Sequence, residues 1–305
     1  MHRLNRRKTM LTLGGILLFS ILYGQEKPKK HFGLPDALQE VSGLYYAGPD
    51  SLWWHNDSGD RPTLYLTNGL GEIKQSIVLP VRNVDWEDIT ADDQGTLFIG
   101  DFGNNNSQRR DLKIYAYTPA SGVLDSISFR YPDQATYTGT SATQSFDVEG
   151  FFWHQDSLHL FSKSKLPKSS FITKHYVLAD QAGEQVAELR DSLYLKNRVV
   201  TAAAIDRNSG RVGLLTYCYN KLLGFLPTSK ATVFFFDNYP EGHFLQGTPW
   251  RKKASCLIAL QYESLDFLPN GYLYIASEQT RFIPPKAKRL RIPKRRQGVT
   301  SRVKP

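Results

Sequence analysis

The sequence predicts an all-β fold: a single β-propeller of four-stranded blades, with five blades expected and six as the alternative. Three observations favour it. Short apolar or alternating runs are separated by turns rich in Gly, Pro, Asn and Asp. The stretches between them lack the period of a helix. The same two-strand unit also returns along the chain, and a repeated β unit without helices is typical of a propeller.

The clearest copy of the repeated unit lies at residues 85–106. Asp85 and Glu87 begin one strand, a polar turn follows at 91–95, and a second strand ends in Asp101 and a loop rich in Gly and Asn. Each of five copies has one aligned residue at the start of its first strand, which we call the first landmark, and one at the end of its second strand, the second landmark. The second landmark lies 14 or 15 residues after the first. The landmark pairs are Ser42 and Asp57, Glu87 and Asp101, Glu149 and Lys163, Ala202 and Tyr217, and Glu263 and Glu278. Such constant spacing indicates five homologous units.

Each copy is expected to continue into further strands of the same blade. The first blade has expected strands at 39–46, 52–57, 64–66 and 73–79, the second at 85–90, 96–101, 112–117 and 126–131, and the third at 147–153, 157–163, 171–178 and 186–195. The fourth has 199–206, 212–217, 231–236 and 255–260, and the fifth has 261–267, 272–278 and 289–292. Residues 32–38 are expected to supply the missing strand of the fifth blade, which closes the ring and removes an exposed sheet edge.

The chain outside the propeller divides into short terminal segments. Residues 1–24 have a basic start and an apolar run at 11–23, which is typical of a signal peptide and too short for a membrane span of roughly 20 residues. An uncleaved N-terminal membrane anchor is the alternative. Residues 25–37 are expected to hold a linker and the ring-closing strand, 38–292 the propeller, and 293–305 a basic disordered tail. We therefore expect a periplasmic or extracellular monomer with no membrane span after cleavage.

The net charge of +9 comes from the two ends of the chain. Residues 1–24 carry four Lys or Arg and no acid, and residues 286–305 carry nine Lys or Arg and no acid. Between them, residues 25–285 carry 25 basic and 29 acidic side chains. The body is therefore mildly acidic, which argues against a nucleic-acid partner, because such a partner needs a basic folded surface.

Acidic residues recur where the innermost strands of the blades are expected to begin. Because side chains alternate along a strand, each first landmark and the residue two places before it share a face, and the five pairs are expected to converge on one mouth of the central channel. Carboxylates this close repel unless a cation, a shared proton or a basic neighbour offsets their charge. Oxygen ligands suit Ca²⁺ better than Zn²⁺. The expected ligands of the metal ion are Asp85, Glu87, Asp147, Glu149 and Glu263.

For Glu87, Glu149 and Glu263 the repeat favours an architectural role over a metal site, because acidic side chains at repeated strand starts often accept backbone N–H groups of the adjacent blade. A further set of residues, at the ends of the second strands and in the loop after Asp101, is expected to face a ligand. This set is Asp57, Asp101, Asn104, Asn105, Arg110 and Glu278. Lys163 and Tyr217 replace an acid in the repeat, so they are the candidates for catalysis if the mouth is an active site.

Four motifs carry a resemblance to known proteins. They are Glu40-Val-Ser-Gly-Leu44, Asn56-Asp-Ser-Gly59, Asp85-Trp-Glu-Asp-Ile89 and Ile99-Gly-Asp-Phe-Gly-Asn-Asn105. Over nearly all of residues 38–280 the chain resembles exported, mostly uncharacterised β-propeller proteins of Bacteroidota. More remotely it is similar to calcium-dependent lactonase and esterase-like propellers of the regucalcin, gluconolactonase and strictosidine synthase kind, and to NHL-repeat proteins. The remote resemblance implies the fold and not a reaction.

Three functions remain open from the sequence, which does not decide whether the protein is an enzyme. The first is an exported propeller that binds a small polar or cationic ligand at the channel mouth, with Ca²⁺ as the one expected cofactor. The second is a metal-dependent hydrolase of an ester, lactone or phosphoester, in which the metal activates water and Lys163 or Tyr217 stabilises developing charge. The third is a scaffold that presents its loops to another envelope protein.

Overall fold

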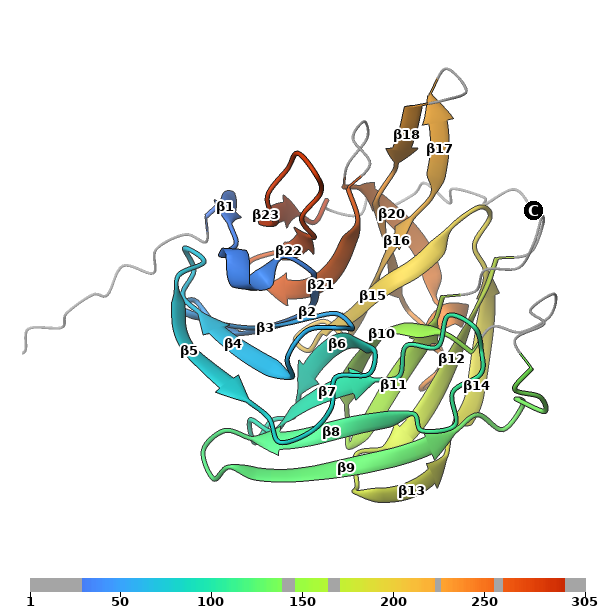
Figure 1. Cartoon of the computed structure of the whole chain (residues 1–305). Helices are drawn as coiled ribbons and strands as arrows, with labels where there is room; N and C mark the ends of the chain where they lie inside the picture. The colour runs from blue at the N-terminus through green and yellow to red at the C-terminus, as the bar shows by residue number, and fades with distance from the viewer. Residues whose placement is uncertain (1–28, 139–145, 164–170, 223–225, 255–259, 294–305) are drawn as a thin grey trace, which may run out of the picture.

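The protein is described by a computed structural model that covers residues 29–138, 146–163, 171–222, 226–254 and 260–293. The covered residues form strands and two short 3₁₀ turns, η1 (Asp36–Leu38) and η2 (Phe244–Gln246) (Figure 1). Within this part of the chain, no helix has the length and apolar character needed to cross a membrane. The expected signal peptide at 1–24, and the expected tail at 293–305 apart from its first residue, lie outside the described residues.

Five antiparallel sheets form the blades, each listed here from the innermost strand outward. Blade 1 is β2 (Val41–Gly48), β3 (Ser51–Asn56), β4 (Thr63–Thr67) and β5 (Ile73–Val78), and blade 2 is β6 (Trp86–Ala91), β7 (Leu97–Asp101), β8 (Lys113–Thr118) and β9 (Val123–Arg130). Blade 3 is β10 (Val148–His154), β11 (Ser157–Ser162), β12 (Ile172–Ala179) and β14 (Glu188–Tyr194). Blade 4 is β15 (Val199–Asp206), β16 (Arg211–Tyr217), β19 (Thr232–Asp237) and β20 (Thr248–Lys253), and blade 5 is β21 (Tyr262–Leu268), β22 (Tyr272–Ser277), β23 (Lys286–Arg291) and β1 (His31–Gly33).

The innermost strands contact one another in a closed cycle, which makes the fold a five-bladed propeller and confirms the expected blade count. The cycle runs through β2, β6, β10, β15 and β21 and returns to β2. The predicted ring closure is also present, because β1 pairs antiparallel with β23 at the outer edge of blade 5. Residues 36–38 of the expected closing strand form η1 instead.

Apolar side chains fill the space between neighbouring blades. Each of five buried clusters joins one pair of adjacent blades, as Trp53 of blade 1 and Trp86 of blade 2 do in one of them. Aromatic residues provide much of this packing, and Trp54 and Trp86 are fully buried. The core therefore surrounds the channel as a ring, and the ends of the innermost strands are left to form the two mouths.

Three outer elements differ from the expectation. The fourth strand of blade 4 is β20, not residues 255–260, of which 255–259 lie outside the described residues. The segment expected as one strand at 186–195 is divided: β13 (Gly183–Val186) pairs parallel with β9 of blade 2, and β14 completes blade 3. The hairpin of β17 (Tyr219–Leu222) and β18 (Leu226–Ser229), which projects from the ring in Figure 1, was not expected. Outer strands such as β14 bury few side chains, so hydrophobic alternation marks them poorly.

Candidate functional site

A β-bulge interrupts the innermost strand of every blade at the same place. The register shifts lie between Val41 and Gly43, Trp86 and Ile89, Val148 and Gly150, Val200 and Ala202, and Tyr262 and Ser264. A bulge leaves its extra residue unpaired and re-aims the side chain. The bulge residues are Ser42, Glu87 with Asp88, Glu149, Thr201 and Glu263. The first landmarks of the repeat are thus bulge residues, except that Thr201 and not Ala202 holds this place in blade 4.

A second recurring position follows the second strand of blades 1, 2, 3 and 5, where a backbone N–H returns to the start of the innermost strand. The N–H of Asp57 donates to the oxygen of Glu40 at 2.9 Å, that of Lys163 to Asp147 at 2.7 Å, and that of Glu278 to Gln261 at 3.1 Å. In blade 2 the donor is Gly103, which bonds to the oxygen of Asp85 at 3.1 Å. Gly103 and not Asp101 therefore corresponds to Asp57, because the two-residue bulge at Glu87 and Asp88 lengthens this repeat.

Gly103 leaves space for two acids. A β-carbon at this position would lie 2.0 Å from Glu87 Oε1 and 2.4 Å from Asp85 Oδ2. Blades 1, 3 and 5 carry a side chain at the equivalent place, which is Asp57, Lys163 or Glu278. In the sequence, this position is marked by the spacing between Glu87 and Gly103, which is longer than the spacing between Ser42 and Asp57 in blade 1.

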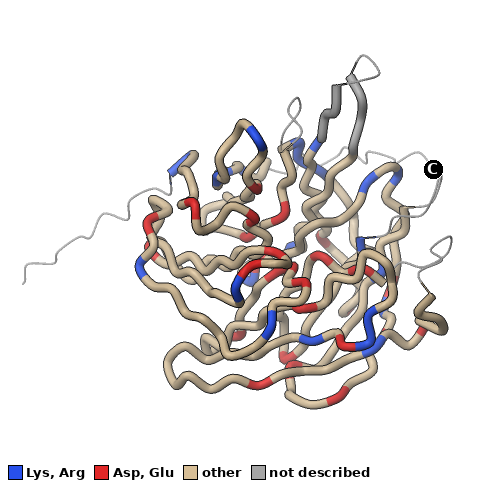
Figure 2. Tube along the Cα trace, viewed as in Figure 1, with Lys and Arg blue, Asp and Glu red and all other residues tan. Residues whose placement is uncertain are grey.

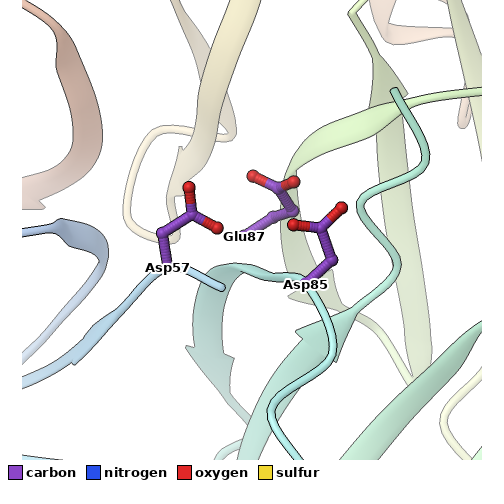
Figure 3. A group of neighbouring side chains, drawn as sticks. All are labelled: Asp57, Asp85 and Glu87. Atoms are coloured by element: carbon purple, nitrogen blue, oxygen red, sulfur yellow. The ribbon is translucent and has the colours of Figure 1, made fainter. Parts of the chain in front are cut away.

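Seven carboxylates from four blades form one continuous group at this mouth, which we call the acidic cluster. It contains three overlapping sets, in each of which one oxygen per residue lies within 4.8 Å of the others: Asp57, Asp85 and Glu87; Asp57, Glu263 and Glu278; and Glu87, Asp147 and Glu149. Figure 3 shows the first set, with the three carboxylates brought together from two neighbouring blades. Figure 2 shows further acidic positions near the centre of the ring. The structure thus brings together all five expected metal ligands and adds Asp57 and Glu278.

Blade 4 interrupts the acidic cluster with uncharged residues. Val199 pairs with Tyr217 across the first two strands, and Thr201 is the bulge residue. The Thr201 hydroxyl donates to the backbone oxygen of Tyr262 at 2.9 Å. The cluster therefore surrounds the mouth on four sides and meets a neutral wall on the fifth.

Burial and mutual repulsion raise the pKa of the cluster acids. Burial, and then the charge of Glu149, hold the pKa of Glu87 well above its usual value. Burial raises the pKa of Asp57 to about 7. Glu263 and Glu278 hydrogen-bond each other, and burial raises the pKa of both. At neutral pH the cluster therefore takes up protons, and a bound cation would displace them.

Lys163 is the basic side chain that forms an ion pair with the cluster in the described part of the chain, through Glu149. Burial acts to lower the pKa of Lys163, but Glu149 outweighs it and keeps the pKa above its usual value, so the ammonium stays charged. The Lys163 side chain is 13% exposed and the Glu149 side chain 4%. The positive charge of Lys163 balances the negative charge of one carboxylate. The charge of the other carboxylates in the cluster must be balanced by bound protons or by a cation.

The residues expected to face a ligand in the loop after β7 do not all reach the mouth. Asp101 accepts the backbone N–H of Asp85 at 3.1 Å and pairs with Arg109 at 2.9 Å. Asn105 is exposed, and the Arg110 guanidinium lies 3.8 Å from the centre of the Tyr137 ring. Arg109 rather than Arg110 is thus the arginine nearer the cluster, where its charge acts on Asp85.

Asn104 links the same loop to the cluster. Its backbone N–H donates to Asp147 Oδ1 at 2.7 Å, which joins blade 2 to blade 3. Its side-chain Oδ1 accepts the N–H groups of Gln108 and Arg109 at 2.8 and 2.9 Å. Asp147 therefore has the architectural role that the sequence left open for the acids, in addition to its place in the cluster.

Other contacts between the innermost strands are made by residues outside the cluster. Asp88 is buried and accepts the backbone N–H of Phe151 at 3.1 Å, and the Ser264 hydroxyl donates to the oxygen of Ser42 at 2.8 Å. These bonds connect blade 2 to blade 3 and blade 5 to blade 1. The Ser42 hydroxyl likewise donates to the backbone oxygen of Glu87, so the protein has inter-blade bonds that do not use the carboxylates of Glu87, Glu149 and Glu263.

Comparison with known proteins supplies no close relative. The chain matches no protein-family profile and no curated protein sequence. Among solved structures it is similar to a mannose phosphorylase from Leishmania mexicana, in complex with phosphate ion, at 14% identity and a TM-score of 0.48, covering 87% of this chain and 86% of that one. Virginiamycin B lyase from Staphylococcus aureus gives 10% identity and 0.43, covering 87% and 88%, and an α-L-arabinofuranosidase from Fusarium graminearum gives 9% and 0.48, covering 87% and 98%. The first two are β-propeller proteins, and at this level neither activity nor ligand transfers to this chain.

Proposed function

We propose that the protein binds a divalent cation in the acidic cluster, with Ca²⁺ as the first candidate, and that this cation holds a small polar ligand at the channel mouth. The observation that carries the proposal is the convergence of seven carboxylates from four blades. Ca²⁺ takes about six to eight oxygen ligands in flexible geometry, which matches carboxylates of this number. The three sets contain no histidine or cysteine, so zinc is disfavoured.

The set of Asp57, Asp85 and Glu87 is the proposed cation position (Figure 3). In each of the other two sets, a neighbouring side chain reduces the repulsion between the carboxylates. Glu149 is paired with Lys163, and Glu263 shares a hydrogen bond with Glu278. The set around Glu87 has no equivalent ion pair among the described residues, and Gly103 gives its oxygens room.

The ligand is proposed to enter from the side of blade 4. Thr201 takes the place of the bulge carboxylate there, and Val199 pairs with the uncharged Tyr217, so an incoming polar or anionic group is not repelled on that side. A cation held by protein carboxylates on the opposite side would keep a coordination position for this group. The basic and apolar start of residues 1–24 supports an exported location, where the protein would meet its ligand outside the cytoplasm.

Calorimetric titration tests the cation site. Protein freed of metal with EDTA is titrated at pH 7.5 with Ca²⁺, Mg²⁺ and Zn²⁺, for the native chain and for the Glu87→Gln and Glu149→Gln variants. We expect Ca²⁺ binding that Glu87→Gln weakens at least tenfold and Glu149→Gln weakens less, because Glu149 is already paired with Lys163. The matched control is Glu72→Gln, an exposed acid after β4 that bonds Asn68. Native-like binding by Glu87→Gln, with its fold intact, contradicts the proposal.

A metal-dependent hydrolase of an ester, lactone or phosphoester is the second candidate. It is favoured by the position of the Lys163 ammonium, which lies at the edge of the cluster and can stabilise negative charge on a reacting oxygen. A screen of aryl esters, lactones and phosphoesters with Ca²⁺ tests it, using Lys163→Met and Tyr217→Phe as variants. Turnover that Lys163→Met abolishes supports an enzyme. Cation binding without turnover above the Lys163→Met background supports a binding protein.

A further inference from the structure

The most exposed large apolar side chain of the described residues lies in the loop between β22 and β23. Phe282 is 85% exposed, and the next in order, Val123, is 54% exposed. A turn fixes the loop, because the N–H of Thr280 donates to the backbone oxygen of Ile283 at 2.8 Å and the N–H of Ile283 donates to the Thr280 hydroxyl at 3.1 Å. Ile283 packs against the buried cluster between blades 4 and 5. The fold therefore anchors Ile283 and leaves Phe282 in solvent.

Basic side chains lie beside this loop, on the outer strands of blade 5. β23 begins four residues after Phe282, and four of its six residues are Lys or Arg. The N–H of Leu34 donates to the backbone oxygen of Pro285 at 3.0 Å, so the segment after β1 lies against the end of the loop. Burial lowers the pKa of His31 in β1, and so do the charges of three neighbouring lysines, which are Lys288, Lys30 and Lys286. The cations of β1 and β23 are thus close enough to act on one another.

The same surface continues into blade 4. The Lys288 ammonium donates to the backbone oxygen of Ala254 at 2.9 Å, directly after the end of β20. β20 itself ends in three basic residues, Arg251, Lys252 and Lys253. Figure 2 shows basic positions along the top of the view, where these outer strands lie. We call this surface the basic edge and define it by Lys30, His31, Lys253, Phe282, Lys286 and Lys288.

The chemistry of the basic edge fits a membrane surface that contains anionic phospholipid. Lysine ammonium groups are attracted to lipid phosphates, and an apolar ring beside them can be buried at the boundary between headgroups and acyl chains. The chain also enters the fold at this edge, since β1 begins at His31, eight residues after the apolar run at 11–23. A segment typical of membrane targeting is therefore covalently joined to the basic edge, which favours lipid over nucleic acid as the anionic partner.

We propose that the basic edge binds the surface of an anionic membrane, with Phe282 inserted among the headgroups and the lysines placed on the lipid phosphates. The edge contains none of the seven carboxylates of the acidic cluster, so the proposal does not rest on the cation site. The docking residues belong to outer strands and one loop, whereas the innermost strands form the channel mouth. Docking in this way leaves the mouth open to its ligand.

Two pairs of variants separate insertion of the ring from attraction of charge. Phe282→Ser removes the exposed ring, and its control is Val123→Ser, at the next most exposed apolar position. A triple variant replaces three cations of the basic edge by glutamine, at Lys30, Lys253 and Lys286. Its control removes the same charge from blades 1 and 2, at Arg61, Lys74 and Lys113. All of these side chains are exposed or half-buried, so the fold is expected to tolerate each change.

Cosedimentation of the full chain with vesicles tests the proposal. The vesicles contain phosphatidylcholine alone, or phosphatidylcholine and phosphatidylglycerol at about three to one. We expect the native chain to partition at least tenfold more strongly into the anionic vesicles, and less strongly when NaCl rises from about 0.1 M to about 0.5 M. We expect Phe282→Ser and the triple variant each to lose about tenfold of the anionic partition, and both controls to keep it.

Residues 11–23 are present in every variant and in both experiments with vesicles, so the differences between vesicle types and between variants measure the basic edge. Equal partition of the native chain into the two vesicle types overturns the proposal. Equal losses in the triple variant and in its control also overturn it, as does native-like partition of Phe282→Ser. Binding of a single-stranded oligonucleotide without a preference for anionic vesicles would assign the edge to nucleic acid instead.

Discussion

The carboxylate of Glu87 lies in the space that Gly103 leaves open, so a side chain at position 103 would displace it. The missing side chain of Gly103 is the space that Glu87 Oε1 fills, since a β-carbon there would lie 2.0 Å away. Glu87 in turn belongs to two of the three carboxylate sets and connects the proposed cation position to Asp147 and Glu149. The absence of a side chain at Gly103 in blade 2 thus leaves the space that allows carboxylates from four blades to come together.

Gly103→Ala is expected to lower the affinity for Ca²⁺ at least tenfold. The added methyl group displaces the carboxylates of Glu87 and Asp85, while the backbone at 103 is outside the positive-φ region, so alanine itself is not strained there. Calorimetric titration of the metal-free variant measures the change. The control is Gly48→Ala, where a β-carbon meets nothing within 4 Å. Equal affinity in both variants contradicts the proposed position of the cation.

Lys163→Met is expected to destabilise the metal-free protein by about 3 kcal/mol, because it leaves the buried Glu149 without its partner. Adding Glu149→Gln to this variant should restore much of the loss, since it removes the unpaired charge. Urea unfolding of the two single variants and the double variant gives the coupling. Strict additivity of the two losses shows that the ion pair is not energetically important.

The stability of the metal-free protein is expected to fall as pH rises from about 4 to above 7. Burial raises the pKa of Asp57 to about 7, and the pKa values of Glu87, Glu149 and Glu263 are also raised, so the folded state binds more protons than the unfolded state over this range. Acids with raised pKa values contribute stability below their unfolded pKa and lose it as pH passes the folded one. Urea unfolding at pH 5 and pH 8, with EDTA, measures this. Saturating Ca²⁺ should stabilise more at pH 8 than at pH 5, and a larger effect at pH 5 is the opposite of what we expect.

Ser264→Ala is expected to cost about 1 kcal/mol of stability and to leave cation affinity unchanged. The Ser264 hydroxyl is buried and donates to the oxygen of Ser42 in the next blade, at 2.8 Å. Denaturant unfolding and calcium titration of the same sample separate the two properties. A large loss of calcium affinity would show that the inter-blade bonds and the acidic cluster are not independent.

Phe32→Ala is expected to destabilise the fold by about 3 kcal/mol, because β1 closes the ring through this side chain. Phe32 is buried and makes edge contacts with Tyr274 and Trp54, at 5.4 and 6.5 Å between centroids. Thermal unfolding measures the loss. The neighbouring His31→Ala, at an exposed position of the same strand, is the control and should change stability little.

The repeat in the sequence contains enough information for the five blades, the closing strand and the meeting of five acids. It reveals these because inner strands bury both faces and repeat their spacing, as β6 and β10 do. The sequence pattern does not mark the bulges, so it aligns Ala202 in place of Thr201 and Asp101 in place of Gly103. A bulge adds a residue, but the sequence does not reveal it here because these inner strands are buried on both faces and show no alternation that it could interrupt.

The loop after β7 shows a second limit of the sequence. Asn104, Asn105 and Arg110 were all expected to face a ligand because their residue types suit one. Only three-dimensional contacts show that Asn104 bonds the loop to Asp147 and that Arg110 lies over Tyr137. Polar residues that build a loop and polar residues that bind a ligand have the same composition, so composition alone does not separate them.

Thermal unfolding of the full chain with EDTA and with added Ca²⁺ tests the central claim most directly. A cation that binds only the folded state adds about 2.7 kcal/mol at 100 times its dissociation constant. We predict a calcium-dependent rise in Tm at pH 7.5 that is absent in Glu87→Gln and retained in Glu72→Gln. An unchanged Tm of the native chain at millimolar Ca²⁺ contradicts a calcium site and leaves the acidic cluster as a set of carboxyl groups that hold shared protons.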